Sequence, residues 1–164
     1  MRKALFVFIA IWIGFLTEFL WLNSFARWSC PNILVVEVVF FNLLLGIRYG
    51  LAAAFMAGVL KDSFSVGVMG EHMLCFVIMA FGTTLLRKHI YSSGSKFSKI
   101  VLVIAALLIH YFVLIIIRFA TSDIDISMLF IYVALPQLIV SLFTTVPIMN
   151  FLKQCVSKLS FMLL

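Results

Sequence analysis

The residues that could do chemistry gather around one glycine-punctuated break in an otherwise apolar chain. Between Gly58 and Gly70 the sequence reads GVLKDSFSVGVMG, and Lys61, Asp62 and Glu71 fall within eleven positions. Glycines allow sharp turns and the close approach of another segment. Asp62 follows a short apolar segment, so it could cap backbone N–H groups of the turn or of the next helix. The simpler alternative is a solvated loop at a membrane interface, in which this aspartate has no further role.

No group of residues has the spacing of a known catalytic or metal site. The chain contains no HExxH, GxSxG or Walker sequence, and no pair of carboxylates three or four positions apart within an apolar segment. Asp123 and Asp125 could share the side of Asp62, but with Ser127 they read more simply as a helix start. The three cysteines form no CxxC or Cys/His cluster. The sequence therefore predicts no enzyme, no catalytic residue, no cofactor and no metal.

The composition is that of a membrane protein. Hydrophobic residues make up 65% of the 164 positions and charged residues 11%, with a mean hydropathy of +1.26, too little polar cover for a water-facing surface. Twelve Lys and Arg against six Asp and Glu give a net charge of +6. No basic, aromatic-rich face lies outside the apolar segments, which excludes nucleic acid as the expected partner. We expect one polytopic all-α membrane domain over residues 1–164.

Six apolar segments are expected, of which the second and third are short. The first could be a signal peptide, because Ser24-Phe25-Ala26 resembles a cleavage site. Its length, and its interruption by Glu18, favour an uncleaved helix instead. Pro136 and Pro147 should kink the last segment. The expected segments are 4–22, 33–45, 51–60, 73–86, 100–120 and about 128–152.

The positive charges predict the orientation of these segments. With six crossings and a cytoplasmic N-terminus, nine Lys and Arg lie inside and three lie outside, which follows the positive-inside rule. Both termini and the basic 87–99 connection are then cytoplasmic. The outside set is Arg27, Lys61 and Arg118, and the inside set is Arg2, Lys3, Arg48, Arg87, Lys88, Lys96, Lys99, Lys153 and Lys158.

Two intramembrane carboxylates lie within these segments. Glu18 could simply reach the outer interface, whereas Glu37 lies mid-segment and needs protonation or a polar partner. Candidate partners for Glu37 are His110, Arg118 or a polar group of another subunit. Small residues at spacing four, Ala53, Ala54, Ala57 and Gly58, would let helices approach closely. The candidate partner-binding residues are Glu37, Asn42, Ala54 and Gly58.

The order of these features resembles the MreD family of rod shape-determining proteins. The residues that carry the resemblance are Pro31 and Asn32 before a short apolar helix, the Gly46-to-Gly50 turn, and the series Gly50, Gly58, Asp62 and Gly70. The last segment, with Pro147 and a basic end at Lys153, is also similar. Glu37 and Lys61 depart from the family pattern, Glu37 replacing an apolar residue and Lys61 placing a charge beside Asp62.

The resemblance implies a non-enzymatic scaffold in the inner membrane of the bacterial cell-elongation (rod shape) machinery. Such a protein would bind MreC directly and would be linked through it to MreB filaments, RodA and a class B transpeptidase that build peptidoglycan. Membrane lipid and a second copy of the chain are further possible partners. The resemblance also implies the fold of the substrate-binding subunit of energy-coupling-factor transporters. A small-molecule (vitamin) binding subunit of such a transporter is therefore the alternative.

Overall fold

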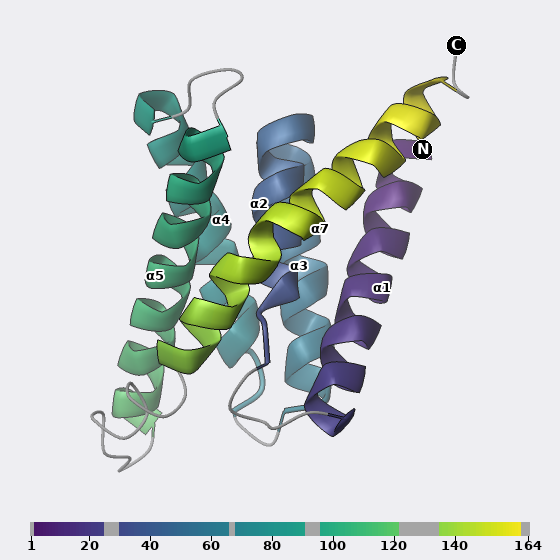
Figure 1. The fold of residues 1–164 in the computed structure, drawn as a ribbon. Coiled ribbons are helices and arrows are strands. Elements are labelled where there is room, and N and C mark those ends of the chain that lie inside the picture. The colour runs from purple at the N-terminus through teal and green to yellow at the C-terminus, as the bar shows by residue number, and fades with distance from the viewer. Residues whose placement is uncertain (1, 25–29, 66–67, 91–95, 122–134, 162–164) are drawn as a thin grey trace.

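A computed structural model describes residues 2–24, 30–65, 68–90, 96–121 and 135–161 (Figure 1). Over these ranges all regular elements are helices, which confirms the all-α class. The helices are α1 (Arg2–Ser24), α2 (Ile33–Leu45), α3 (Ile47–Ser63), α4 (Glu71–Ile90), α5 (Lys96–Thr121) and α7 (Leu135–Phe161).

The helices lie where the six segments are expected, but α3 and α4 are longer than the expected 51–60 and 73–86, and residues 47–50 of the expected Gly46-to-Gly50 turn belong to α3. Pro31 and the N-cap residue Asn32 directly precede α2, as expected. Gly46 has φ +91°, a conformation that glycine adopts readily, so the chain passes from α2 to α3 through this one residue. Pro136 lies in the first turn of α7, where proline needs no hydrogen bond, so only Pro147 is inside the helix. The expected start of the last segment at Met128 falls outside the described residues.

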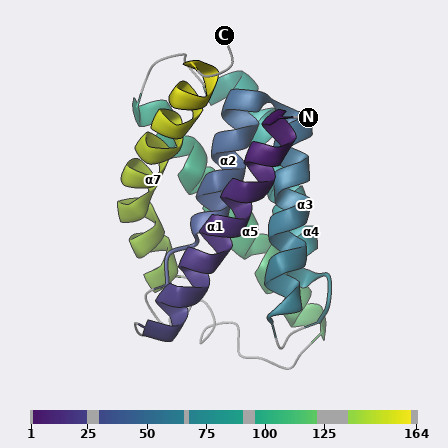
Figure 2. The same ribbon diagram turned by 90° about the vertical axis from the view of Figure 1, so that its right-hand side faces the viewer.

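Helix α2 forms the centre of the bundle. Every residue from Ile33 to Leu43 is buried, as expected for a helix that is apolar all round. Helix α1 packs across α2 and α3, α4 packs against α3 and α5, and α7 crosses α2 diagonally (Figures 1 and 2). Eleven of the thirteen residues of α2 are thus enclosed by neighbouring helices.

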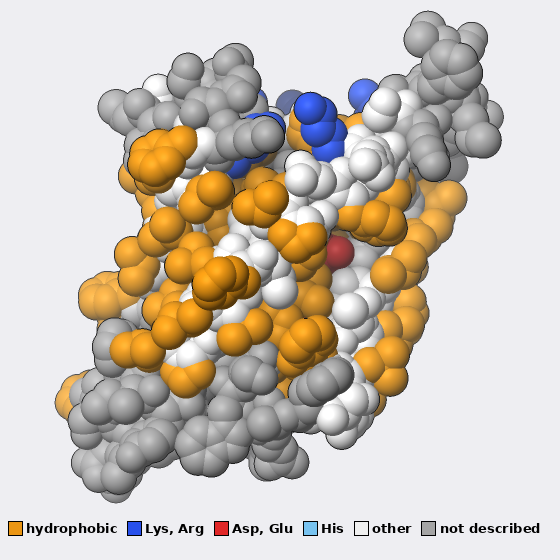
Figure 3. All heavy atoms as spheres, viewed as in Figure 1, with side chains coloured by type: hydrophobic (Ala, Val, Ile, Leu, Met, Phe, Trp, Pro, Cys, Tyr) orange, Lys and Arg blue, Asp and Glu red, His pale blue; other side chains and the backbone are white. Residues whose placement is uncertain are grey.

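Three helices are long and apolar enough to cross a membrane: Lys3–Ser24, Phe97–Thr121 and Leu135–Ser157. Helix α2 is equally apolar but reaches only about 20 Å at 1.5 Å per residue. Apolar side chains cover much of the outer face of the bundle (Figure 3), including Phe8, Phe112 and Phe143. The chain is therefore a helical membrane protein, and the crossing of α2, α3 and α4 stays a prediction.

Both termini lie at the same end of the bundle (Figure 1). Lys and Arg side chains gather at that end in the space-filling view (Figure 3). The last turn of α4 and the first turn of α5 also lie at this end (Figure 1). The arrangement agrees with an even number of crossings between the N-terminus and the 87–99 connection.

We expect Ser93→Cys to resist labelling by a membrane-impermeant thiol reagent added to intact cells, because the positive-inside rule places this connection in the cytoplasm. Ser127→Cys, in the 121–127 connection predicted outside, should be labelled in the same assay. Strong labelling of Ser93→Cys without permeabilisation would contradict the six-segment topology.

The native cysteines interfere little with this test. Cys30 lies between α1 and α2, where burial, and secondarily the charge of Glu18, raise the pKa of its thiol to about 12. Such a thiol carries almost no reactive thiolate at neutral pH. Cys75 is also buried, and neither it nor Cys155 forms a disulfide. Cys30→Ser gives a background free of the outer thiol.

Candidate functional site

Asp62 joins the end of α3 to the start of α4. Its Oδ2 accepts hydrogen bonds from the backbone N–H groups of Gly70 (3.1 Å) and Met73 (3.1 Å), and its Oδ1 accepts one from the N–H of His72 (2.9 Å). His72 Nδ1 lies 3.0 Å from the same Oδ1. Asp62 thus caps α4 from another helix, as its position suggested. The side chain of His72 is buried in this contact.

The capping geometry depends on a glycine-rich turn. Gly70 has φ +96° and directs its N–H at Asp62. No atom of the described residues lies within 4 Å of the position that a Cβ of Gly70 would occupy, so the positive φ is what requires glycine here. The expected sharp turn before α4 is therefore confirmed at Gly70.

The small residues of α3 face the interior of the chain. Ala53, Ala54 and Ala57 are fully buried, and a Cβ on Gly58 would lie 2.3 Å from the Cα of Met73 in α4. The small-residue stripe thus allows α3 and α4 to pack backbone to backbone. Ala54 and Gly58 were proposed as part of a partner-binding face, but in this fold that face is occupied by α4.

A partly buried ion pair lies beside Asp62. Lys61 Nζ donates to Glu18 Oε1 (2.7 Å) and to the side-chain oxygen of Asn32 (3.3 Å). Glu18 Oε2 accepts the backbone N–H of Leu34 (3.4 Å), while the N–H of Asn32 donates to Ser141 Oγ of α7 (2.8 Å). Glu18 was expected to reach the outer interface. Instead, only 5% of this residue is exposed, and Lys61 neutralises its charge inside the bundle.

Lys61 and its partners border a polar cavity of about 160 Å³ near the end of the bundle opposite the termini. In its wall, the hydroxyl of Tyr111 donates a hydrogen bond to Gln137 Oε1 (2.8 Å). Arg118 also lines the cavity and pairs with Glu71 of α4. His110 is 1% exposed, and its Nδ1 has no hydrogen-bond partner among the described residues. The cavity lining is Glu18, Leu22, Cys30, Asn32, Lys61, His72, His110, Tyr111, Leu114, Arg118 and Gln137.

Glu37 lies on a different side of α2, against α1. A Cβ on Gly14 would lie 2.3 Å from Glu37 Oε2, so the carboxyl group occupies the space beside this glycine and would have to shift if a larger residue stood there. Glu37 Oε2 has no hydrogen-bond partner among the described residues. Neither His110 nor Arg118, its two candidate partners, contacts it: Arg118 pairs with Glu71, and His110 lines the polar cavity.

Asn42 connects α2 to α4. Its amide nitrogen donates to the carbonyl of Ala80 (2.8 Å) and to the hydroxyls of Thr83 (3.0 Å) and Thr84 (2.9 Å). A Cβ on Gly50 would lie 2.7 Å from the Cβ of Asn42, so the motif glycine Gly50 makes room for this side chain. Glu37 and Asn42 thus face different helices, and both are buried.

Sequence reasoning did not bring together the residues that line the polar cavity. Glu18 and Lys61 could have been paired, because opposite charges in an apolar chain are expected to meet. His110 and Gln137 carry no comparable signal, since they stand alone in apolar runs. Over the described ranges, no group of three or more His, Cys, Asp and Glu could hold a metal. These polar side chains are suited to binding a partner or a ligand and to holding the helices together.

Comparisons with known proteins agree with the pattern in the sequence. The family model described as rod shape-determining protein MreD matches residues 1–158. No curated protein and no solved structure matches the chain.

Proposed function

The chain belongs to the MreD family of rod shape-determining proteins, and from this membership we propose that it is a non-enzymatic scaffold of the cell-elongation machinery in the bacterial inner membrane. In this proposal it binds MreC directly. Through MreC it is linked to MreB filaments, RodA and a class B transpeptidase, and so to peptidoglycan synthesis. Its contribution to rod shape is to position partners in the membrane.

The observation that supports a scaffold is an apolar groove between α1 and α3. Its volume is about 610 Å³, and its walls come from the first two turns of α1 and the first half of α3. Two exposed alanines, Ala4 and Ala52, line it. The lining residues are Ala4, Leu5, Val7, Phe8, Tyr49, Ala52 and Met56.

We infer that part of a partner's single transmembrane helix lies in this groove. In lipid, helices gain no hydrophobic energy by associating, so close packing and shape provide the affinity. Small residues such as Ala4 and Ala52 let a partner backbone approach, and the groove offers space for its large side chains. We place the MreC helix here, in place of the buried small-residue face of α3.

Filling the groove should release the partner without unfolding the chain. We expect Ala52→Phe to lower co-purification of MreC about tenfold, since overpacking costs about 1–3 kcal/mol. Ala52 is exposed, so the substitution leaves the core unchanged. Cells that depend on this variant should lose rod shape. The measurement is the ratio of MreC to tagged protein after detergent extraction.

The matched control is Leu108→Phe, which enlarges an exposed side chain on α5, away from the groove. It should retain MreC and rod shape. Retention of MreC by folded Ala52→Phe would place the partner surface elsewhere. Turnover of a lipid-linked substrate by the purified protein would contradict the scaffold itself.

The polar cavity raises a second candidate function, because a small-molecule binding subunit of an energy-coupling-factor transporter would need a polar pocket for its ligand. Ligand pockets for drug-sized molecules usually have volumes of about 300–1,000 Å³, whereas this cavity has about 160 Å³. The scaffold is therefore preferred. A rise in the melting temperature of the purified protein with a water-soluble vitamin would favour the transporter subunit.

A further inference from the structure

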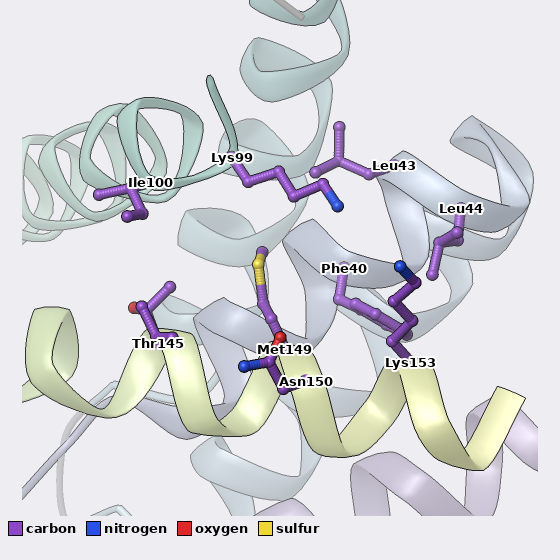
Figure 4. A pocket seen from close by; sticks show the side chains of 10 residues that line it. Phe40, Leu43, Leu44, Lys99, Ile100, Thr145, Met149, Asn150 and Lys153 are labelled. Atoms are coloured by element: carbon purple, nitrogen blue, oxygen red, sulfur yellow. The ribbon is translucent and has the colours of Figure 1, made fainter. Parts of the chain in front are cut away.

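A third pocket lies between α2, α5 and α7, near the end of the bundle that holds the termini (Figure 4). Its volume is about 230 Å³. Leu43 and Leu44 of α2 and Met149 of α7 form part of an apolar wall, and Lys99 of α5 and Lys153 of α7 are its charged groups. This pocket is separate from the polar cavity and from the α1–α3 groove.

The two lysines form an uncompensated pair of positive charges. Figure 4 shows both ammonium groups extending into the space between α2, α5 and α7. The ion pairs of the described residues involve Lys61, His72 and Arg118, and no described residue forms an ion pair or hydrogen bond with Lys99 or Lys153. Two like charges beside a low-dielectric wall repel one another unless an anion lies between them. The pocket is therefore complementary to a negative group.

The apolar wall of the pocket indicates an anion that carries an acyl chain, not a small hydrated ion. A small hydrated ion would gain nothing from Leu43, Leu44 and Met149, whereas an acyl chain would pack against them. Leu44 is 49% exposed, so the wall is open to the surrounding lipid. The positive-inside rule places this end at the headgroup level of the cytoplasmic leaflet, where basic pockets between helices bind anionic headgroups.

We propose that this pocket binds an anionic phospholipid. Its phosphate lies between Lys99 and Lys153, and one acyl chain lies along Leu43, Leu44 and Met149. Because α2, α5 and α7 all border the pocket, the bound lipid holds the diagonal helix α7 against the rest of the bundle. The proposal does not depend on the partner surface between α1 and α3.

The test compares phosphatidylglycerol with phosphatidylcholine on the full-length protein by native mass spectrometry. The wild-type protein should prefer phosphatidylglycerol about 25-fold, since each lysine near an anionic lipid contributes about fivefold. Lys99→Gln/Lys153→Gln should abolish this preference. The matched control, Lys3→Gln/Lys88→Gln, removes two exposed charges outside the pocket and should keep it.

Two further variants separate the headgroup from the acyl chain. Lys153 is exposed, so Lys153→Gln should fold normally and lower the preference about fivefold. Val146 lines the pocket and is 46% exposed, so Val146→Trp should fill it and lower binding of both lipids. Equal binding of the two lipids by the wild-type protein would overturn the proposal. So would an equal loss of preference in the control, or full competition by water-soluble glycerol phosphate.

Discussion

Replacing Gly58 by leucine is expected to prevent accumulation of the folded protein. A Cβ at this position would lie 2.3 Å from the Cα and 2.9 Å from the backbone N of Met73. These are backbone atoms of α4, which cannot move aside as a flexible side chain could. The two helices would have to separate, and the buried contacts of Ala54 and Ala57 would be lost with them.

Even alanine at position 58 should be harmful. In a helix, alanine is more favourable than glycine by about 1 kcal/mol, which would make the variant more stable if Gly58 were exposed. Overpacking costs about 1–3 kcal/mol or more, and contact with backbone belongs at the upper end. We therefore expect Gly58→Ala to lower the free energy of unfolding by about 2 kcal/mol.

The measurement is thermal unfolding of the detergent-purified protein, followed by loss of its monodisperse gel-filtration peak. Ala52→Leu is the matched control, because it enlarges a small residue on the exposed face of the same helix. It should leave the melting temperature unchanged. A Gly58→Leu protein that folds as well as this control would show that α3 and α4 do not pack as described.

Replacing Asp62 by asparagine is expected to have the second largest effect. Both carboxylate oxygens accept backbone hydrogen bonds at the start of α4, from Gly70, His72 and Met73. The amide of asparagine retains one acceptor and turns an NH₂ group toward at least one N–H. Hydrogen bonds to charged groups contribute about 1.5–3 kcal/mol, and the negative charge also favours a helix N-terminus. The loss should be about 3 kcal/mol.

This effect should appear both in the purified protein and in cells. Asp62→Asn should melt earlier and fail to restore rod shape in a strain that lacks the protein. Ser63→Ala removes an exposed neighbouring hydroxyl that bonds only within α3 and should behave as the wild-type protein does. Normal stability of Asp62→Asn would mean that the start of α4 does not need this carboxylate.

Replacing Gly70 by leucine, at the same turn, is expected to destabilise the protein less and for a different reason. Its φ of +96° costs a residue with a Cβ about 1–2 kcal/mol, and its surroundings offer space for a side chain. Gly70→Leu should therefore be less harmful than Gly58→Leu, although both replace a glycine by the same residue. The comparison distinguishes a backbone conformation from a close approach of helices.

Several features followed from the sequence alone because they depend on local chemistry. Long apolar runs predict helices in a membrane, since the backbone must satisfy its own hydrogen bonds there. The bounds of α2 were predicted to the residue by Pro31, Asn32 and Gly46, which stop or start helices. The capping role of Asp62 followed from its position between a helix end and a turn rich in glycine.

The tertiary structure decided which faces meet. Helix α2 is apolar all round, so its sequence carries no periodicity that tells which side faces α1 and which faces α4. The separation of Glu37, which lies against Gly14, from Asn42, which lies against Ala80, follows only from the packing. Small residues on α3 predicted a close approach of some helix, and only the fold shows that this helix is α4. The ion pair of Glu18 with Lys61 joins residues 43 positions apart, a contact that depends on how whole helices cross.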